Sequence, residues 1–315
     1  MKDFPLVSIF IPIYNTGFYV VQALATVKQQ SYPNIECYVV DDASVDNSKA
    51  IVKSWLDENN FECHFVEHEI NKGLTQSLNE FLVWAKGEFF TFIGDDLWVD
   101  DKLYRQVLAF QEAGSDCALV YGDMMLIDED NRLISESYFK KKGWNETVEM
   151  PSGRVSIMTY LEKAFIPAPS VMLRTDYVRS VGGYDDSLYT EDVDMWAKLL
   201  SRYEVRYVPE TLVKYRIRQN SMSNDRKNVW KVHQTHLYIW PKYLDAVHGA
   251  DRDKLLNKIF NDIIRYYKAT GDKELCLKVI HKMKVYSRAM VWIKLIIYIR
   301  LGLPKKLVGH FVSWK

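Results

Sequence analysis

The sequence predicts an α/β fold with a largely parallel sheet, followed by a helical C-terminal extension. Over the first hundred positions, short apolar segments rich in β-branched residues alternate with helical patterns of about a dozen residues, which is typical of βαβ units and a parallel sheet. Acidic pairs directly follow several of these apolar segments. From about Val229 onward the pattern is mostly helical.

In the first third of the chain, turn or helix signals bound each apolar segment. Pro12 lies near the end of the first segment, where a strand tolerates a missing N–H. Asp46 and Ser48 favour a helix start. The strands expected here are 7–13, 35–40, 62–67 and 88–93, and the helices are 17–30, 46–59 and 74–85.

The rest of the chain is less regular, and residues 130–165 show no clear period. Gly182-Gly183 is expected to stop a short helix, as glycine does after a helix C-terminus. The strands expected here are 117–121, 170–174, 205–208 and 212–215, and the helices are 103–113, 175–181 and 191–202.

Four acidic clusters fall at or near the ends of expected elements: Asp41 with Asp42, Asp95 with Asp96, Asp123 with Asp128, and Glu191 with Asp192 and Asp194. The carboxyl ends of parallel strands meet at one edge, so the first two pairs are expected at a common crevice. Gathering carboxylates costs free energy, because like charges repel and each group loses water. A metal cation or a polar ligand would offset this cost, which indicates a metal-assisted site for a phosphorylated substrate.

Each motif has a functional and a structural interpretation. The Asp41-Asp42 pair fits a ribose or a base edge, or else a turn before a helix. Asp95 and Asp96 fit a magnesium or manganese ion that neutralises a diphosphate, or else a solvated turn. The acids at 191–194 fit a general base, or else partners of a helix dipole. The cations at 216 and 218 fit a diphosphate clamp, or else surface charge.

Seven motifs in a fixed order resemble a family 2 glycosyltransferase of the GT-A fold, a Rossmann-like nucleotide-binding sheet flanked by helices. The resemblance covers residues 6–223, about two thirds of the chain. The motifs are Ile11-Pro-Ile-Tyr-Asn15, Val39-Val-Asp-Asp-Ala-Ser-Val-Asp-Asn-Ser48, Asn71-Lys-Gly-Leu74, Phe92-Ile-Gly-Asp-Asp-Leu-Trp98, Val181-Gly-Gly-Tyr-Asp185, Glu191-Asp-Val-Asp-Met-Trp196 and Tyr215-Arg-Ile-Arg-Gln-Asn-Ser-Met-Ser223.

The resemblance implies an inverting transferase that moves a sugar from a nucleotide sugar, a UDP-sugar by preference, to a hydroxyl of a glycan or lipid-linked glycan. By position, it implies Asp96 as the ligand of Mn²⁺ or Mg²⁺ and Asp192 as the general base. Arg218 stands where relatives often carry a histidine, and Gly94 interrupts the usual Asp-x-Asp pattern. The residues implied for the donor are Pro12, Tyr14, Asp41, Asp42, Lys72, Asp95, Arg216 and Arg218, and those implied for the acceptor are Glu191, Tyr184 and Trp196.

The expected domain organisation is a catalytic domain over 1–224 and a basic helical region over 225–315. The catalytic domain divides into a nucleotide-sugar half, 1–105, and an acceptor half, 106–224. The basic region holds 19 Lys+Arg against 7 Asp+Glu, which suggests an anionic surface as a partner. Within it, the apolar and cationic segment 287–306 fits a helix lying on an anionic membrane, a helix packed on the core, or an oligomer interface.

The composition and the absence of targeting signals indicate where the protein is located. At 48% hydrophobic and 26% charged residues, the chain is typical of a folded soluble protein. The absence of a signal-peptide pattern and of an apolar stretch of membrane length predicts a cytoplasmic protein. The basic C-terminal region fits a peripheral position at the inner face of the cell membrane. The four cysteines are expected to be free thiols.

Two rival functions stay open on the sequence. A nucleotidyltransferase would carry a phosphate-binding loop after the first strand, where this chain has Tyr14-Asn-Thr-Gly17, and a dehydrogenase would carry a GxGxxG motif there. A non-catalytic protein of the same fold that binds nucleotide sugars is the second rival. No nucleic-acid recognition motif is present, so a nucleic-acid partner is not expected.

Overall fold

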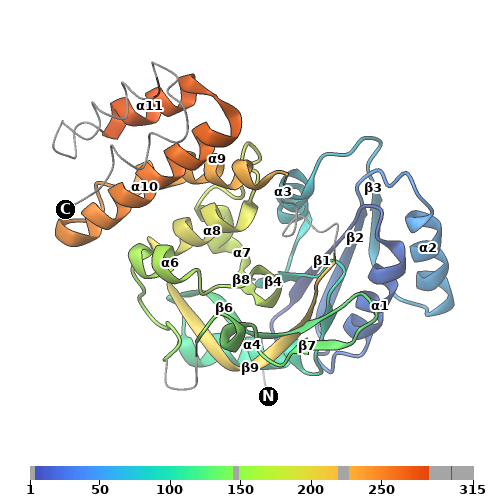
Figure 1. Cartoon of the computed structure of the whole chain (residues 1–315). Coiled ribbons are helices and arrows are strands. Elements are labelled where there is room, and N and C mark those ends of the chain that lie inside the picture. The colour runs from blue at the N-terminus through green and yellow to red at the C-terminus, as the bar shows by residue number, and fades with distance from the viewer. Residues whose placement is uncertain (1–3, 145–148, 219–226, 284–298, 300–315) are drawn as a thin grey trace. The chain divides into compact units, whose positions relative to one another are not determined.

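The computed structural model describes residues 4–144, 149–218, 227–283 and 299 (Figure 1). The chain divides into two compact units. The first unit comprises Met1–Asp186 and Glu191–Ser221, and the second comprises Ser187–Thr190 and Met222–Lys315. The expected boundary at 224 lies outside the described residues, as does the segment 287–306 apart from Ile299.

The first unit is built on one sheet, whose strands follow the order β3-β2-β1-β4-β8-β6-β9-β5, with β7 paired to β6. Its strands are β1 (Val7–Ile13), β2 (Ile35–Asp41), β3 (His64–Glu67), β4 (Phe89–Phe92), β5 (Leu97–Trp98), β6 (Cys117–Ile127), β7 (Leu133–Ser135), β8 (Met172–Arg174) and β9 (Glu204–Arg216).

The sheet is parallel in its first half and mixed in its second. The strands β3, β2, β1 and β4 are parallel neighbours, as the alternation of strands and helices predicts. The short strand β8 is antiparallel to both β4 and β6, while β6 and β9 are parallel to each other. Therefore β4, β6 and β9 run in one direction, and the ends of β4 and β9 share an edge with those of β1 and β2.

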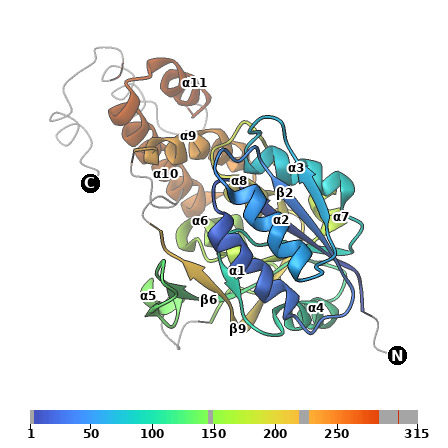
Figure 2. The same ribbon diagram turned by 90° about the vertical axis from the view of Figure 1, so that its right-hand side faces the viewer.

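Helices cover both faces of this sheet. They are α1 (Gly17–Lys28), α2 (Ser48–Glu58), α3 (Leu74–Trp84), α4 (Lys102–Ala113), α5 (Tyr138–Lys141), α6 (Ile157–Lys163), α7 (Thr175–Ser180) and α8 (Glu191–Leu200). Figure 2 shows α1 and α2 lying across one face of the sheet.

The alternation of side chains along β1 explains why both faces are covered. Ile9 and Ile11 belong to a buried cluster that includes Val20 of α1 and Val52 of α2. Phe10 points to the opposite face, where its ring centroid lies 5.1 Å from that of Phe81 in α3. Successive side chains of a strand face opposite sides, so an apolar run of this kind must be covered twice.

Two strands are longer than the sequence predicts. The segment from Cys117 continues to Ile127, and 204–216 forms one strand where two were expected. Pro209 falls at a register shift, because Gly122 pairs with Val208 while the next residue of β6 pairs with Thr211. Proline lacks the N–H of a ladder bond and is tolerated at such a bulge, so it does not end the strand here.

The two carboxylates of the third acidic cluster, Asp123 and Asp128, make local hydrogen bonds. Asp123 lies inside β6 and accepts a hydrogen bond from the hydroxyl of Ser137, the N-cap residue of α5. The carboxylate of Asp128 accepts hydrogen bonds from the backbone N–H groups of Asp130 and Arg132, which closes a turn. Both carboxylates are thus used in local structure, in a region expected to be irregular.

The second unit is helical over its described residues, with α9 (Val229–Ile239), α10 (Gly249–Thr270) and α11 (Lys273–Met283). Buried Leu237, Ile259 and Ile280, one from each helix, contribute to its core. Among the helices of the described residues, none is long and apolar enough to cross a membrane. The four cysteines are all unpaired, as expected.

Candidate active site

The ends of β1, β2 and β3 place polar residues side by side at one edge of the sheet. In the parallel register, Ile13 pairs with Asp41, and Asp41 pairs with Glu67. The residues that follow, Tyr14, Asp42 and His68, therefore leave the sheet at the same level. Pro12 lies just before this edge, opposite Val40 of β2. A pocket of about 640 Å³ opens here, lined by Tyr14, Asp41 and His68 among others.

Asp41 presents a buried acceptor to this pocket. The residue is 1% exposed. Its Oδ2 atom accepts a hydrogen bond from the backbone N–H of Ser44 at 3.3 Å. Its Oδ1 atom is buried and has no hydrogen-bond partner among the residues that the structure describes. An unpaired buried carboxylate oxygen costs free energy, so this atom is well suited to accept a hydrogen bond from a ligand.

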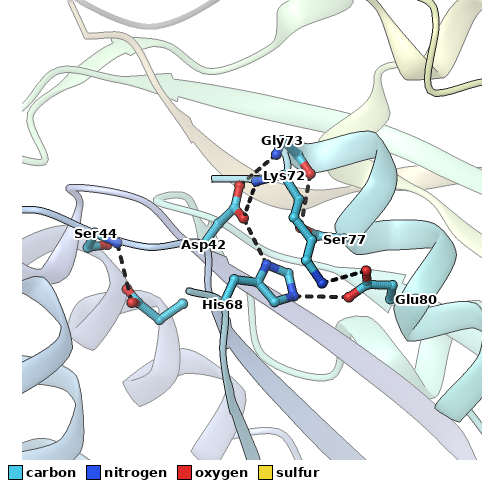
Figure 3. A network of polar contacts seen from close by, with 8 residues as sticks. Asp42, Ser44, His68, Lys72, Gly73, Ser77 and Glu80 are labelled. Carbon is cyan, nitrogen blue, oxygen red and sulfur yellow. Dashed lines mark hydrogen bonds and ion pairs between the residues drawn. The ribbon is translucent and has the colours of Figure 1, made fainter. Parts of the chain in front are cut away.

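Asp42 has a different set of contacts, although it is the adjacent residue (Figure 3). Its Oδ1 atom accepts a hydrogen bond from the backbone N–H of Lys72 and contacts Nδ1 of His68, both at 2.8 Å. Its Oδ2 atom accepts from the backbone N–H of Gly73 at 2.8 Å. Asp42 therefore fastens the loop that leads into α3. It is Asp41 that lines the pocket, and a nucleoside contact from Asp42 stays a prediction.

His68 links this loop to α3 and was missed in the sequence analysis. Its Nε2 atom lies 3.0 Å from Oε2 of Glu80, and the ammonium of Lys72 lies 2.7 Å from Oε1 of the same carboxylate. Burial opposes ionisation of Glu80, but Lys72 and His68 hold its pKa below the ordinary value. Its position in the sequence could have indicated a place at the site, because His68 directly follows β3 just as Asp42 directly follows β2.

A second acidic group forms where β4 ends. Asp96 is 7% exposed, and its Oδ1 atom accepts a hydrogen bond from the backbone N–H of Arg216 at 2.8 Å. Burial, together with the charge of Asp95, raises the pKa of Asp96 to about 8. Asp95 forms an ion pair with the guanidinium of Arg218. The sheet thus brings Asp95 and Asp96 together with two arginines, Arg216 and Arg218, that follow about 120 positions later in the sequence.

The two arginines at the end of β9 have different surroundings. Arg216 is 1% exposed, and its guanidinium donates to the backbone oxygen of Asp95 at 2.8 Å, to Asn131 at 2.7 Å and to Gln22 at 3.0 Å. Arg216 therefore fastens the end of β4 to neighbouring elements, which differs from its expected diphosphate contact. Arg218 lies over the ring of Tyr19, at 5.3 Å from its centroid.

The N-terminus of α8 carries the third acidic group. The Oδ1 atom of Asp192 accepts a hydrogen bond from the backbone N–H of Val193 at 2.7 Å. Burial and the neighbouring charge of Asp192 raise the pKa of Glu191 to about 7. Asp194 is buried and lies 2.7 Å from the ammonium of Lys198, so it has a structural ion pair. The first turn of α8 thus places the carboxylates of Glu191 and Asp192 next to each other.

Two residues expected at the acceptor are buried, which corrects their predicted role. Trp196 is 1% exposed and Tyr184 is 4% exposed, so neither ring presents a face to a bound sugar. They were expected there because they are aromatic, but aromatic side chains pack in a protein core more often than they stack on a sugar. Their burial supports the position of α8.

These features define the class of the protein. A sheet of this order, with a pocket at the ends of β1 to β3 and an acidic pair after β4, is that of a GT-A glycosyltransferase. The chain belongs to glycosyl transferase family 2, whose sequence model matches residues 8–179. The prediction of the family and of the enzyme class from sequence motifs is thus confirmed.

Similar proteins agree with this assignment. The chain is 28% identical to an uncharacterized glycosyltransferase of Rickettsia typhi over 302 residues, which is 93% of this chain and 91% of that protein. It is 25% identical, over 84% of this chain and 81% of the relative, to the GalNAc(5)-diNAcBac-PP-undecaprenol beta-1,3-glucosyltransferase of Campylobacter jejuni.

Solved structures show the same fold. TarS of S. aureus (residues 1–349), in complex with UDP-GlcNAc, superposes with a TM-score of 0.65 and 18% identity, covering 94% of this chain and 87% of that chain. The mannosyltransferase PcManGT of Pyrobaculum calidifontis, in complex with GDP-Man and Mn²⁺, gives a TM-score of 0.59 and 17% identity, covering 98% and 84%.

Proposed function

We propose that this glycosyltransferase moves a sugar, with inversion at the anomeric carbon, from a UDP-sugar to a hydroxyl of a glycan or lipid-linked glycan. The observation that carries the proposal is the buried, unpaired Oδ1 of Asp41 in a pocket at the sheet edge where Asp96 also lies. The pocket supplies a place for the nucleoside, and Asp96 supplies a place for the charge of its diphosphate.

The hydrogen bonds that Asp41 already makes indicate which nucleobase the donor carries. Its Oδ2 atom is occupied by Ser44, which leaves one unpaired oxygen. A single acceptor matches a base edge with a single N–H donor between two carbonyl groups, as in uracil. Guanine presents two adjacent donors on its corresponding edge and calls for a bidentate carboxylate. This supports UDP over GDP, although similar folds bind UDP-GlcNAc in one case and GDP-Man in the other.

The diphosphate of the donor would be met by a divalent cation and by Arg218. Asp96 fits the cation, because carboxylate oxygen is the ligand that Mg²⁺ and Mn²⁺ prefer and because this carboxylate is buried beside a second acid. When bound, the metal would neutralise the charge that develops on the leaving diphosphate. Asp95 orients Arg218 through their ion pair, and the guanidinium also lies over the ring of Tyr19.

The transfer itself would be a single displacement. Asp192 takes the proton of the acceptor hydroxyl while the hydroxyl oxygen forms a bond to the anomeric carbon. The bond between that carbon and the diphosphate oxygen breaks, and the nucleoside diphosphate leaves on the opposite side. Because one displacement occurs, the configuration at the anomeric carbon inverts. Glu191, beside Asp192, is suited to hold an acceptor hydroxyl.

The acceptor and the location are part of the same proposal. A Campylobacter relative is named for a substrate carried on undecaprenyl diphosphate, a membrane lipid. A lipid-linked acceptor would bring this enzyme to the inner face of the cell membrane, where nucleotide sugars of the cytoplasm are at hand. The excess of 19 Lys+Arg over 7 Asp+Glu in residues 225–315 supports contact with an anionic surface.

The Asp192→Asn variant tests the catalytic part. We expect release of UDP from UDP-sugars to fall about 100- to 10,000-fold, which is the usual contribution of a general base, while UDP binding stays unchanged. Asp176→Asn is the matched control, because Asp176 also lies in the first turn of a helix and is exposed. If Asp192→Asn turned over as fast as the wild type, Asp192 would not be the general base. Wild-type protein that binds UDP-sugars but turns none over would favour a non-catalytic role.

A further inference from the structure

A cluster of two histidines and an aspartate joins two helices of the second unit. His233 and His236 lie one turn apart on α9, and Asp262 lies on α10. Nδ1 of His233 is 2.8 Å from Oδ1 of Asp262, and Nδ1 of His236 is 3.2 Å from Oδ2 of the same carboxylate. Asp262 is 3% exposed, so both of its oxygens meet imidazole nitrogens in a largely dry environment.

The spacing of these atoms is close to that of a metal site. Ligand atoms about 2.0–2.2 Å from a tetrahedral zinc ion are about 3.3 Å apart. The two nitrogen–oxygen distances fall short of this by half an ångström or less. One ligand atom from each of the three side chains lies within 4.8 Å of the others. Small rotations of the side chains would therefore open the cluster around an ion.

The chemistry of the three ligands selects the kind of ion. Two imidazoles and one carboxylate suit Zn²⁺ and its neighbours among the transition metals, whereas Mg²⁺ and Ca²⁺ prefer oxygen ligands. The i, i+3 spacing on α9 presents both rings on one face of the helix, toward α10. The ring of Trp240 lies 5.3 Å from that of His236 and supports its orientation. Lys258 is the nearby cation, at 5.8 Å from the Trp240 ring, and would reduce the affinity without occupying the cluster.

We propose that His233, His236 and Asp262 bind a divalent transition metal of the zinc class. Three protein ligands leave the fourth position of a tetrahedral ion to water or to another donor. When the ion is bound, each imidazole would present the lone pair of Nδ1 to it and carry its proton on Nε2. The ion ties α9 to α10 and stabilises the second unit. The proposal does not depend on the sugar donor.

The first test uses the whole wild-type chain, freed of metal with a chelator and then titrated with Co²⁺ and Zn²⁺. We expect about one equivalent of Co²⁺ to give the visible absorption bands of a tetrahedral site, and Zn²⁺ to displace it. The reading needs no variant, so it does not depend on how a substitution folds. Absence of these bands, with no binding of Zn²⁺, would show that the three residues are only a hydrogen-bond network.

Variants then assign the site. His233→Gln and His236→Gln keep a hydrogen-bond donor toward Asp262 but lose the imidazole. Removing a residue that hydrogen-bonds to a metal ligand typically weakens metal binding about 10- to 100-fold. Removing a ligand itself should therefore weaken Zn²⁺ binding at least about 100-fold. His248→Gln, at an exposed histidine of the same unit, should bind Zn²⁺ as the wild type does. Unchanged Zn²⁺ binding in both histidine variants would overturn the assignment.

Discussion

The substitution Asp42→Ala should destabilise the first unit, because one buried carboxylate holds three donors. Two of these donors are the backbone N–H groups of Lys72 and Gly73, and the third contact is Nδ1 of His68. Alanine accepts none of these bonds. The loop before α3 then loses its attachment to the end of β2, and His68 keeps only its contact with Glu80.

The magnitude follows from the number of groups left unpaired. A buried donor without a partner costs about 1–3 kcal/mol. Lys72 and Gly73 are half-buried, so water offsets part of their loss, and His68 is buried. We expect the free energy of unfolding to fall by about 3–5 kcal/mol. Urea unfolding followed by tryptophan fluorescence measures this change.

Two further variants complete the experiment. Asp42→Asn keeps one acceptor oxygen and should lose about half as much. Asp57→Ala replaces an exposed aspartate of α2 and should stay within about 0.5 kcal/mol of the wild type. The reasoning is refuted if Asp42→Ala is no less stable than Asp57→Ala.

Other expectations concern a glycine pair and the pH dependence. Gly17→Ala should lower the free energy of unfolding, measured with urea, by about 2 kcal/mol or more, because the added Cβ would lie 2.5 Å from the backbone of Ser48. The Cβ of Gly94→Ala meets nothing within 4 Å, so this variant should be as stable as the wild type. Equal losses in both would contradict this. Burial raises the pKa of Glu191 from about 4.5 to about 7, so its folded state favours the proton and wild-type stability falls as pH rises across that range. The free energy of unfolding of Glu191→Gln, taken relative to that of the wild type, should therefore rise by about 2–3 kcal/mol between pH 4 and pH 8. A difference between the two proteins that stays constant with pH would contradict this expectation.

The parallel half of the sheet was predictable, because the alternation of apolar strands with amphipathic helices has one common architecture. The directions of the later strands were not, since β8 carries no sign in its sequence that it runs antiparallel to β4 and β6. The single strand β9 was expected as two strands, 205–208 and 212–215, on either side of Pro209. Only its partner β6 shows that a bulge absorbs the proline.

The candidate site was predictable in its location and less so in its roles. The rule that parallel strands end at one edge placed Asp41 and Asp96 at the same edge of the sheet, at the ends of β2 and β4, with β1 between them. It did not distinguish Asp41 from Asp42, because the N–H groups that occupy Asp42 come from a loop about 30 residues later. Arg216 and Arg218 likewise share a motif, but only the fold shows that the first is 1% exposed.

Nucleotide binding tests the central claim most directly. The measurement is the thermal unfolding of the wild type, Asp41→Asn and Asp96→Asn, each alone, with Mn²⁺, with UDP and with both. A ligand that binds the folded state raises its apparent stability by mass action. We predict the largest rise for the wild type with UDP and Mn²⁺ together, no added effect of Mn²⁺ on UDP binding in Asp96→Asn, and UDP binding about 10- to 100-fold weaker in Asp41→Asn. Folded wild-type protein that no UDP concentration stabilises, with or without Mn²⁺, would contradict the account.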